Sequence, residues 1–149
     1  MEVALVTDWS HTKSWSGDPR SIADVRRFVR VCLATHRCEE SGDDVALVVS
    51  ELATNAVIHA STAFSVTLAS RRDALVLTVQ DAAISRPNYG RDDPYGLGGR
   101  GLRIVDAHCS AWGISSEVEG GKGVWASFDG GAQTSAIRAD GEGVGGVVR

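Results

Sequence analysis

The chain has 149 residues, of which 43% are hydrophobic, and its formal net charge at pH 7 is −4. This length suits one compact domain with a substantial core and is too short for two ordinary ones. The isoelectric point is near 5.5, and no stretch is rich in Lys and Arg. Because proteins that bind nucleic acid usually present a basic surface, nucleic acid is not an expected partner.

The composition also bears on the cellular compartment. No apolar stretch approaches the length that spans a membrane, and the first residues lack the basic start of a signal peptide. The three cysteines are odd in number and have no C-x-x-C spacing, which argues against a disulfide framework and against a zinc site. We therefore expect a cytoplasmic protein with reduced thiols and no membrane partner.

The first half of the chain is predicted to contain two helices. After a short strand at residues 3–6, a helix is expected over 19–35, with Asp18 as its N-cap and Pro19 in its first position. Apolar residues recur along this segment at helical spacing. A second helix follows, and its predicted buried stripe consists of Val45, Val48, Val49, Leu52 and Ala56.

The second half of the chain is predicted to consist mainly of strands. Residues 63–71 and 74–82 alternate apolar and other side chains, which predicts an antiparallel hairpin. Residues 82–100 are rich in Gly and have no periodicity, which predicts a long loop, and a short helix is expected at 101–109. Two further strands joined by a glycine-rich turn are expected at 111–118 and 123–129.

The order of these elements predicts an α+β fold, a two-layer sandwich with helices on one face of a mostly antiparallel sheet. The domain is expected to span residues 15–130, preceded by an N-terminal segment at 1–14. Residues 131–149 form a glycine-rich tail without apolar periodicity, and we expect this tail to be disordered.

A line of polar residues runs along the second helix. Glu51, Asn55 and His59 are spaced by four in the otherwise apolar stretch ALVVSELATNAVIHA, so they share one helical face. A carboxylate can take the proton of a hydroxyl nucleophile, and an amide oxygen is a suitable Mg²⁺ ligand, so Glu51 and Asn55 fit a phosphoryl-transfer site. An isolated E-x-x-x-N pair more often belongs to a solvated helix face. The pair alone therefore does not distinguish a phosphoryl-transfer site from such a face.

Two further motifs indicate a nucleotide site only in combination with that polar line. Asp81 ends an apolar strand, where a carboxylate can accept a hydrogen bond from an exocyclic amine such as adenine N6, or can cap a turn. In YGLGGRGLRIV, the glycines leave backbone N–H groups open near a helix N-terminus, an arrangement that binds phosphate. These glycines, which also fit a plain flexible loop, are Gly96, Gly98, Gly99 and Gly101.

Other nucleotide and metal motifs lack the context that they need. The glycine run matches G-x-G-x-x-G, but no parallel strand precedes it and no β-α-β unit surrounds it, so a Rossmann fingerprint is not indicated. Lys122 lacks the G-x-x-x-x-G-K-S/T frame of a P-loop. Without spaced partners, no metal site is indicated by the remaining candidate ligands, His59, His108 and Cys109.

Four stretches in chain order resemble the nucleotide-binding boxes of a known superfamily. SELATNAVIHA, VQDAAISRP, GLGGRGLRIVD and GGKGVWASF resemble the N, G1, G2 and G3 boxes of the Bergerat-fold ATPases, the superfamily of gyrase and the histidine kinases. Within it, the chain resembles small bacterial ATP-binding proteins similar to anti-sigma factor serine/threonine kinases, over about residues 15–128. Four boxes in order are far more specific than any one box, and the family architecture agrees with the α+β prediction.

The resemblance implies a site for ATP and Mg²⁺. By position, Glu51 corresponds to the catalytic base, Asn55 to the Mg²⁺ ligand and Asp81 to the carboxylate that recognises adenine. The segment between Asp81 and Gly101 corresponds to the lid over the nucleotide. The residues that the resemblance places at the nucleotide within this motif are Gly98, Gly99, Arg100, Gly101 and Leu102.

Two boxes depart from the family pattern. The first glycine box reads D-A-A-I-S from Asp81 to Ser85, without the two glycines of the usual D-x-G-x-G. In the third box, Gly123 stands where a Thr often follows GGK, which removes one hydroxyl donor. These departures bear on nucleotide affinity and more strongly on turnover.

The resemblance implies an ATP- and Mg²⁺-dependent serine/threonine kinase that phosphorylates a small protein antagonist, with Glu51 as its base. The alternative is a non-catalytic module that binds ATP and holds a sigma factor or an antagonist without modifying it. Labelled ATP and candidate antagonists distinguish the two functions. The sequence does not name the partner or the oligomeric state, and a homodimer is one arrangement open to it.

Overall fold

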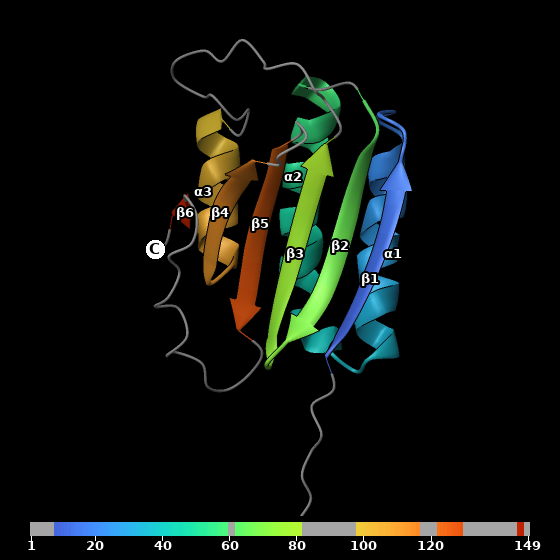
Figure 1. Ribbon diagram of the computed structural model, residues 1–149, viewed down its shortest axis with the longest axis vertical. Coiled ribbons are helices and arrows are strands. Elements are labelled where there is room, and N and C mark those ends of the chain that lie inside the picture. Colours follow the sequence, from blue (N-terminus) through green and yellow to red (C-terminus); the bar gives the residue numbers. More distant parts are fainter. Residues whose placement is uncertain (1–7, 60–61, 82–97, 117–121, 130–145, 148–149) are drawn as a thin grey trace, which may run out of the picture.

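The structure is a computed structural model that describes residues 8–59, 62–81, 98–116, 122–129 and 146–147. Its elements are β1 (Trp9–Trp15), α1 (Ser21–Thr35), the 3₁₀ turn η1 (Glu39–Ser41), α2 (Gly42–His59), β2 (Phe64–Arg71), β3 (Ala74–Asp81), α3 (Gly98–His108), β4 (Ala111–Ser116), β5 (Lys122–Asp129) and β6 (Gly146–Val147). The strands form one antiparallel sheet in the order β1-β2-β3-β5-β4-β6, and the three α-helices cover one of its faces (Figure 1). The predicted α+β class is confirmed.

The hydrophobic core lies between the sheet and the helices. All five residues predicted to form the buried stripe of α2 have an exposed fraction of 7% or less. On α1, Val25 and Val29 are fully buried and face the same core. Strand β3 contributes every second residue, because Leu75, Leu77 and Val79 are buried while the residues between them are not. The periodicities of 3.6 and 2 therefore identified the buried faces correctly.

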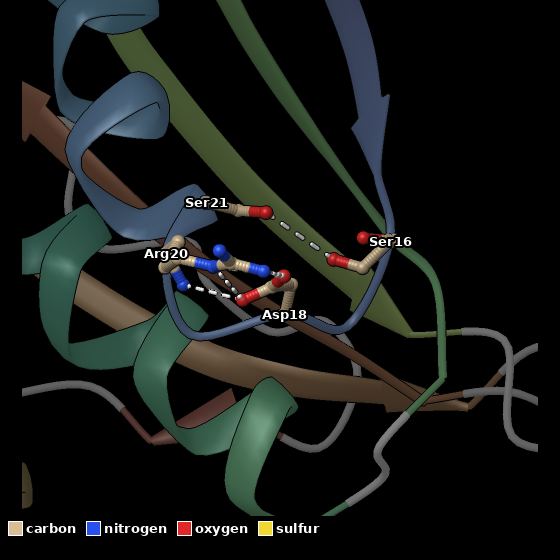
Figure 2. Close-up of polar contacts among 4 residues, drawn as sticks. All are labelled: Ser16, Asp18, Arg20 and Ser21. Atoms are coloured by element: carbon tan, nitrogen blue, oxygen red, sulfur yellow. Dashed lines mark hydrogen bonds and ion pairs between the residues drawn. The ribbon is translucent and has the colours of Figure 1, made fainter.

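The start of α1 differs from the prediction by two residues. The sequence predicts Asp18 as the N-cap and Pro19 as the first helical residue, which is wrong, because the helix begins at Ser21. The N–H of Ser21 donates to the Asp18 carbonyl (2.8 Å) and that of Ile22 to the Pro19 carbonyl (3.3 Å), the spacing of a tighter turn. The Asp18 carboxylate accepts hydrogen bonds from the guanidinium and, second in effect, from the backbone N–H of Arg20 (Figure 2), and both lower the pKa of Asp18.

The hairpin of β2 and β3 is confirmed, and its turn is two residues long. Arg71 pairs with Ala74, so Arg72 and Asp73 alone connect the strands. Both have positive φ, 56° and 69°, which matches the twist of the strands in a turn where Asn-Gly is more usual. The N–H of Arg72 donates to the Asp8 carboxylate (3.1 Å) and so ties the turn to the residue before β1.

The edge strand β1 is not predicted by the sequence. Its residues WSHTKSW lack an alternating apolar pattern, yet all seven pair with β2. Trp15 pairs with the buried Phe64 and its ring packs against that of Phe64, so this face of β1 meets the helix-covered side of the sheet. The sheet therefore begins inside the segment 1–14, which the sequence places before the domain. The strand predicted at residues 3–6 lies outside the described residues.

The C-terminal strands complete the sheet. Strand β5 lies between β3 and β4, so the predicted hairpin of β4 and β5 joins the sheet through its second strand. Within the tail that the sequence predicts to be disordered, Gly146–Val147 pair with β4. The rest of that tail, most of the predicted long loop and most of the glycine-rich turn lie outside the described residues. No helix in the described ranges is long and apolar enough to cross a membrane.

Candidate functional site

The predicted polar line lies on one side of the central helix α2. Glu51 and Asn55 are half-buried, and their neighbours Leu52 and Ala56 are buried in the core. Helix α2 packs against α1, α3 and β3 (Figure 1). The line is therefore at the border of the core, which disfavours the alternative of a freely solvated helix face. His59 ends α2, and its side chain lies outside the described part of the chain.

A contact between α2 and α3 shows which way the line faces. Asp44 Oδ1 lies 2.9 Å from Nδ1 of His108, the last residue of α3. Glu51 follows Asp44 by seven residues and Asn55 follows it by eleven, so at 3.6 residues per turn both lie within about 20° of Asp44 around the helix axis. The face of α2 that carries Glu51 and Asn55 is therefore the face turned towards α3. Sequence reasoning missed the pairing of Asp44 with His108, because 64 residues separate them.

The antiparallel packing of α2 and α3 brings the start of α3 to the polar line (Figure 1). At 1.5 Å per residue, Asn55 lies about 16.5 Å along α2 from Asp44, and Gly98 lies about 15 Å along α3 from His108. Since the helices meet at Asp44 and His108, the first turn of α3 comes level with Asn55.

The glycine motif forms the first turn of α3. The sequence predicts this helix from residue 101, whereas it begins at Gly98. The first backbone N–H groups of a helix have no partner within it, and the helix dipole makes this end favourable for anions. All five residues that the resemblance places at the nucleotide in this motif, Gly98 to Leu102, belong to α3. Gly96 and the rest of the predicted lid lie outside the described residues.

Asp81 lies at the same end of the domain, in the sheet. It is the last residue of β3, and its exposed fraction is only 6%. It follows Leu77 and Val79 at two-residue spacing, so it lies on the face that the helices cover. Strand β3 ends where α2 ends and α3 begins (Figure 1). A buried carboxylate in this position does not fit the alternative of a solvated turn residue.

At this end of the domain, one buried donor has no partner in the part of the chain that the structure describes. The carboxamide Nδ2 of Asn55 is buried and has no hydrogen-bond partner among the described residues. A buried donor without an acceptor costs about 1–3 kcal/mol, so few are kept without a reason. A phosphate oxygen would accept this hydrogen bond, and Oδ1 of the same amide is a hard oxygen suited to Mg²⁺. The residues present therefore fit a nucleotide phosphate with Mg²⁺.

The sequence matches the family model of the histidine kinase-like ATPase domain over residues 15–128. The chain belongs to this family. Its histidine kinase-like ATPase domain extends from the last residue of β1 through β5, and ATP binding follows from family membership. The predicted resemblance is thereby confirmed at the level of the domain. No curated protein matches the sequence.

Gly123, where the third box departs from the family pattern, lies away from the polar line. Gly123 pairs with Gln80 and Ser115, and its neighbour Val124 is buried on the helix-covered face, so position 123 belongs to the opposite face of the sheet. A Cβ atom at Gly123 would come within 3.1 Å of Ser115 Oγ. The pairing with β4 therefore leaves little room for a side chain here, and a hydroxyl at this position would not reach the face of Asp81.

Proposed function

We propose that this ATP-binding protein is a Mg²⁺-dependent serine/threonine kinase of the anti-sigma factor type, which transfers the γ-phosphate of ATP to a small protein antagonist. The observation that carries the proposal is the buried Nδ2 of Asn55, which has no hydrogen-bond partner in the described part of the chain and lies one turn from Glu51, level with the start of α3. Family membership accounts for ATP binding. The arrangement on α2 adds a metal ligand and a base on one helical face.

Each residue acts on a different part of the nucleotide. Asp81 accepts a hydrogen bond from the adenine amine, and the first N–H groups of α3 bind the phosphates. Asn55 would hold Mg²⁺ through Oδ1, and bound Mg²⁺ would neutralise part of the phosphate charge. Glu51 takes the proton of the attacking hydroxyl, whose oxygen bonds to the γ-phosphorus while the bond from that phosphorus to the β-phosphate oxygen breaks.

The proposed substrate is a Ser or Thr hydroxyl of a small protein antagonist, and a sigma factor is a second proposed partner, both in the cytoplasm. Among the described residues, Glu51 is half-buried at the border of the core, so its carboxylate can be reached by a hydroxyl that approaches from solvent. A binding module without phosphate transfer would use the same ATP contacts and would not need this base.

The test compares Glu51→Gln with the parent protein, using labelled ATP and candidate antagonists encoded beside its gene. Loss of the base should lower phosphate transfer by about 10²- to 10⁴-fold. The affinity for ATP should stay within a few-fold, because a base acts on the nucleophile and not on the bound nucleotide. Glu40→Gln is the matched control, because it makes the same change in η1, before the start of α2, and should leave transfer unchanged.

The same experiment can also contradict the kinase proposal. If the parent protein transfers no phosphate to any candidate, yet its affinity for one of them changes with ATP, the protein is a binding module. The same result would leave ATP binding and the roles of Asp81 and Asn55 in it intact.

A further inference from the structure

Two histidines from different elements meet at the edge of the domain. His11 lies in β1 and His36 directly follows α1, yet their Nε2 atoms are 2.9 Å apart. Both side chains are half-buried, so the pair is within reach of solvent. Trp9 stacks on the His36 ring with 4.0 Å between ring centroids, and its ring is also tilted against that of His11. These contacts restrict the orientations of both imidazoles.

This pair is remote from the nucleotide site. Strand β1 begins and α1 ends at the end of the domain opposite to that where β3 ends and α3 begins (Figure 1). No nucleotide role assigned to Glu51, Asn55 or Asp81 involves these histidines.

The distance between the two nitrogens restricts what the pair can bind. With metal–nitrogen bonds of about 2.05 Å, a separation of 2.9 Å corresponds to an angle of about 90° at the metal. Such an angle occurs between neighbouring ligands in square-planar and octahedral coordination, which Cu²⁺ and Ni²⁺ prefer. A tetrahedral Zn²⁺ would need the two nitrogens about 3.3 Å apart. Imidazole is also a poor ligand for Mg²⁺, which prefers oxygen.

We propose that His11 and His36 form a two-histidine site for a divalent transition metal of the Cu²⁺ or Ni²⁺ type. Each ring binds the metal through the Nε2 lone pair, and water fills the remaining positions. In the metal-free pair one Nε2 donates its proton to the other, so on metal binding the donating ring carries that proton on Nδ1 instead. The neutral pair loses no proton in this change.

The described residues give the metal two protein ligands and no more. No group of three or more His, Cys, Asp or Glu residues that could hold a metal is present among them. The thiol of Cys38 is two residues from His36, but its Sγ donates to the His36 carbonyl (3.4 Å).

The bound metal would join the start of β1 to the end of α1. The other half of the strand is already held to α1, because Trp15 Nε1 donates to the Asp24 carboxylate (2.8 Å) and Lys13 pairs with it (3.2 Å). A metal at His11 and His36 would hold the first half in the same way. Because the metal binds the folded state, it should raise the unfolding temperature.

The first experiment titrates the full chain with Ni²⁺, without nucleotide and with excess Mg²⁺, using calorimetry. His11→Gln and His36→Gln should each weaken Ni²⁺ binding by about tenfold or more, since even groups that only orient a metal ligand contribute that much. The double variant, which lacks both ligands, should bind Ni²⁺ at least as weakly as the weaker single variant. His108→Gln, a histidine on α3, is the matched control and should keep the parental affinity. Equal affinity in the parent and both single variants would refute the site.

A second measurement needs no substitution and does not depend on how the variants fold. Ni²⁺ is paramagnetic, so substoichiometric Ni²⁺ should broaden the imidazole NMR signals of His11 and His36 before those of His59 and His108. Broadening that starts at His59 or His108 would overturn the proposal.

Discussion

Replacing Asn55 by Leu should stabilise the nucleotide-free protein and abolish its response to nucleotide. The two side chains have the same number of heavy atoms and the same branching, so the change removes the amide and keeps the shape of the side chain. In the parent protein, Asn55 Nδ2 is buried without a partner among the described residues, which costs about 1–3 kcal/mol of stability. Leu is also a better helix former than Asn by a few tenths of a kcal/mol.

The expected gain is therefore about 1–3 kcal/mol in the free energy of unfolding without nucleotide. For a domain of this size, 1 kcal/mol shifts the unfolding midpoint by about 4 °C, so the midpoint of the variant should rise by about 4–12 °C. With Mg²⁺ and ATP the order of stability should reverse. At 1,000 times its dissociation constant a ligand stabilises the folded state by about 4.1 kcal/mol, which would raise the parental midpoint by about 16 °C.

The assay is thermal unfolding followed by circular dichroism, with and without Mg²⁺ and ATP, for both proteins. Thr54→Val is the control, because it exchanges a polar for an apolar group of the same shape on the next residue, about 100° around α2, and should keep the parental ATP shift. The reasoning is refuted if Asn55→Leu is less stable than the parent without nucleotide, or if it keeps the full ATP shift.

Two further predictions concern carboxylates. Asp81→Asn should reduce the ATP-induced rise in unfolding temperature, because the amide nitrogen puts a donor where adenine needs an acceptor; equal shifts of the parent with ATP and GTP would count against this role. Hydrogen bonds from Trp15 Nε1 and Lys13 lower the pKa of Asp24 in the folded protein, so this stabilisation is present above the unfolded pKa of about 3.9 and is lost as the pH falls through the folded pKa. Asp24→Asn should therefore flatten the loss of stability between about pH 5 and pH 2 in urea denaturation, and an unchanged slope would contradict this account.

The sequence by itself determined the two long helices, the β2–β3 hairpin and their buried faces. A period of 3.6 or 2 reports that one face of an element is buried, whatever covers that face, so the stripe from Val45 to Ala56 could be read without knowing its neighbours. The four boxes likewise named Glu51, Asn55 and Asp81 as candidate site residues. That Asn55 and Asp81 come to one end of the domain, with Glu51 one helical turn away, depends on the packing of α2 on β3 and α3, which the sequence pattern does not contain.

Only the tertiary structure decided the edge strand, the start of α3 and the contacts between distant residues. In β1, His11 and Lys13 point towards α1, on the same face as Trp9 and Trp15. Because this inward face carries two polar residues, the sequence does not show the apolar–polar alternation that indicates a strand. Helix α3 begins with two glycines, which are poor helix formers, yet it packs along α2. The pairs Asp44–His108 and His11–His36 are 64 and 25 residues apart in sequence. Local periodicity reports which side of an element is buried, but the partner on that side is set by the path of the whole chain.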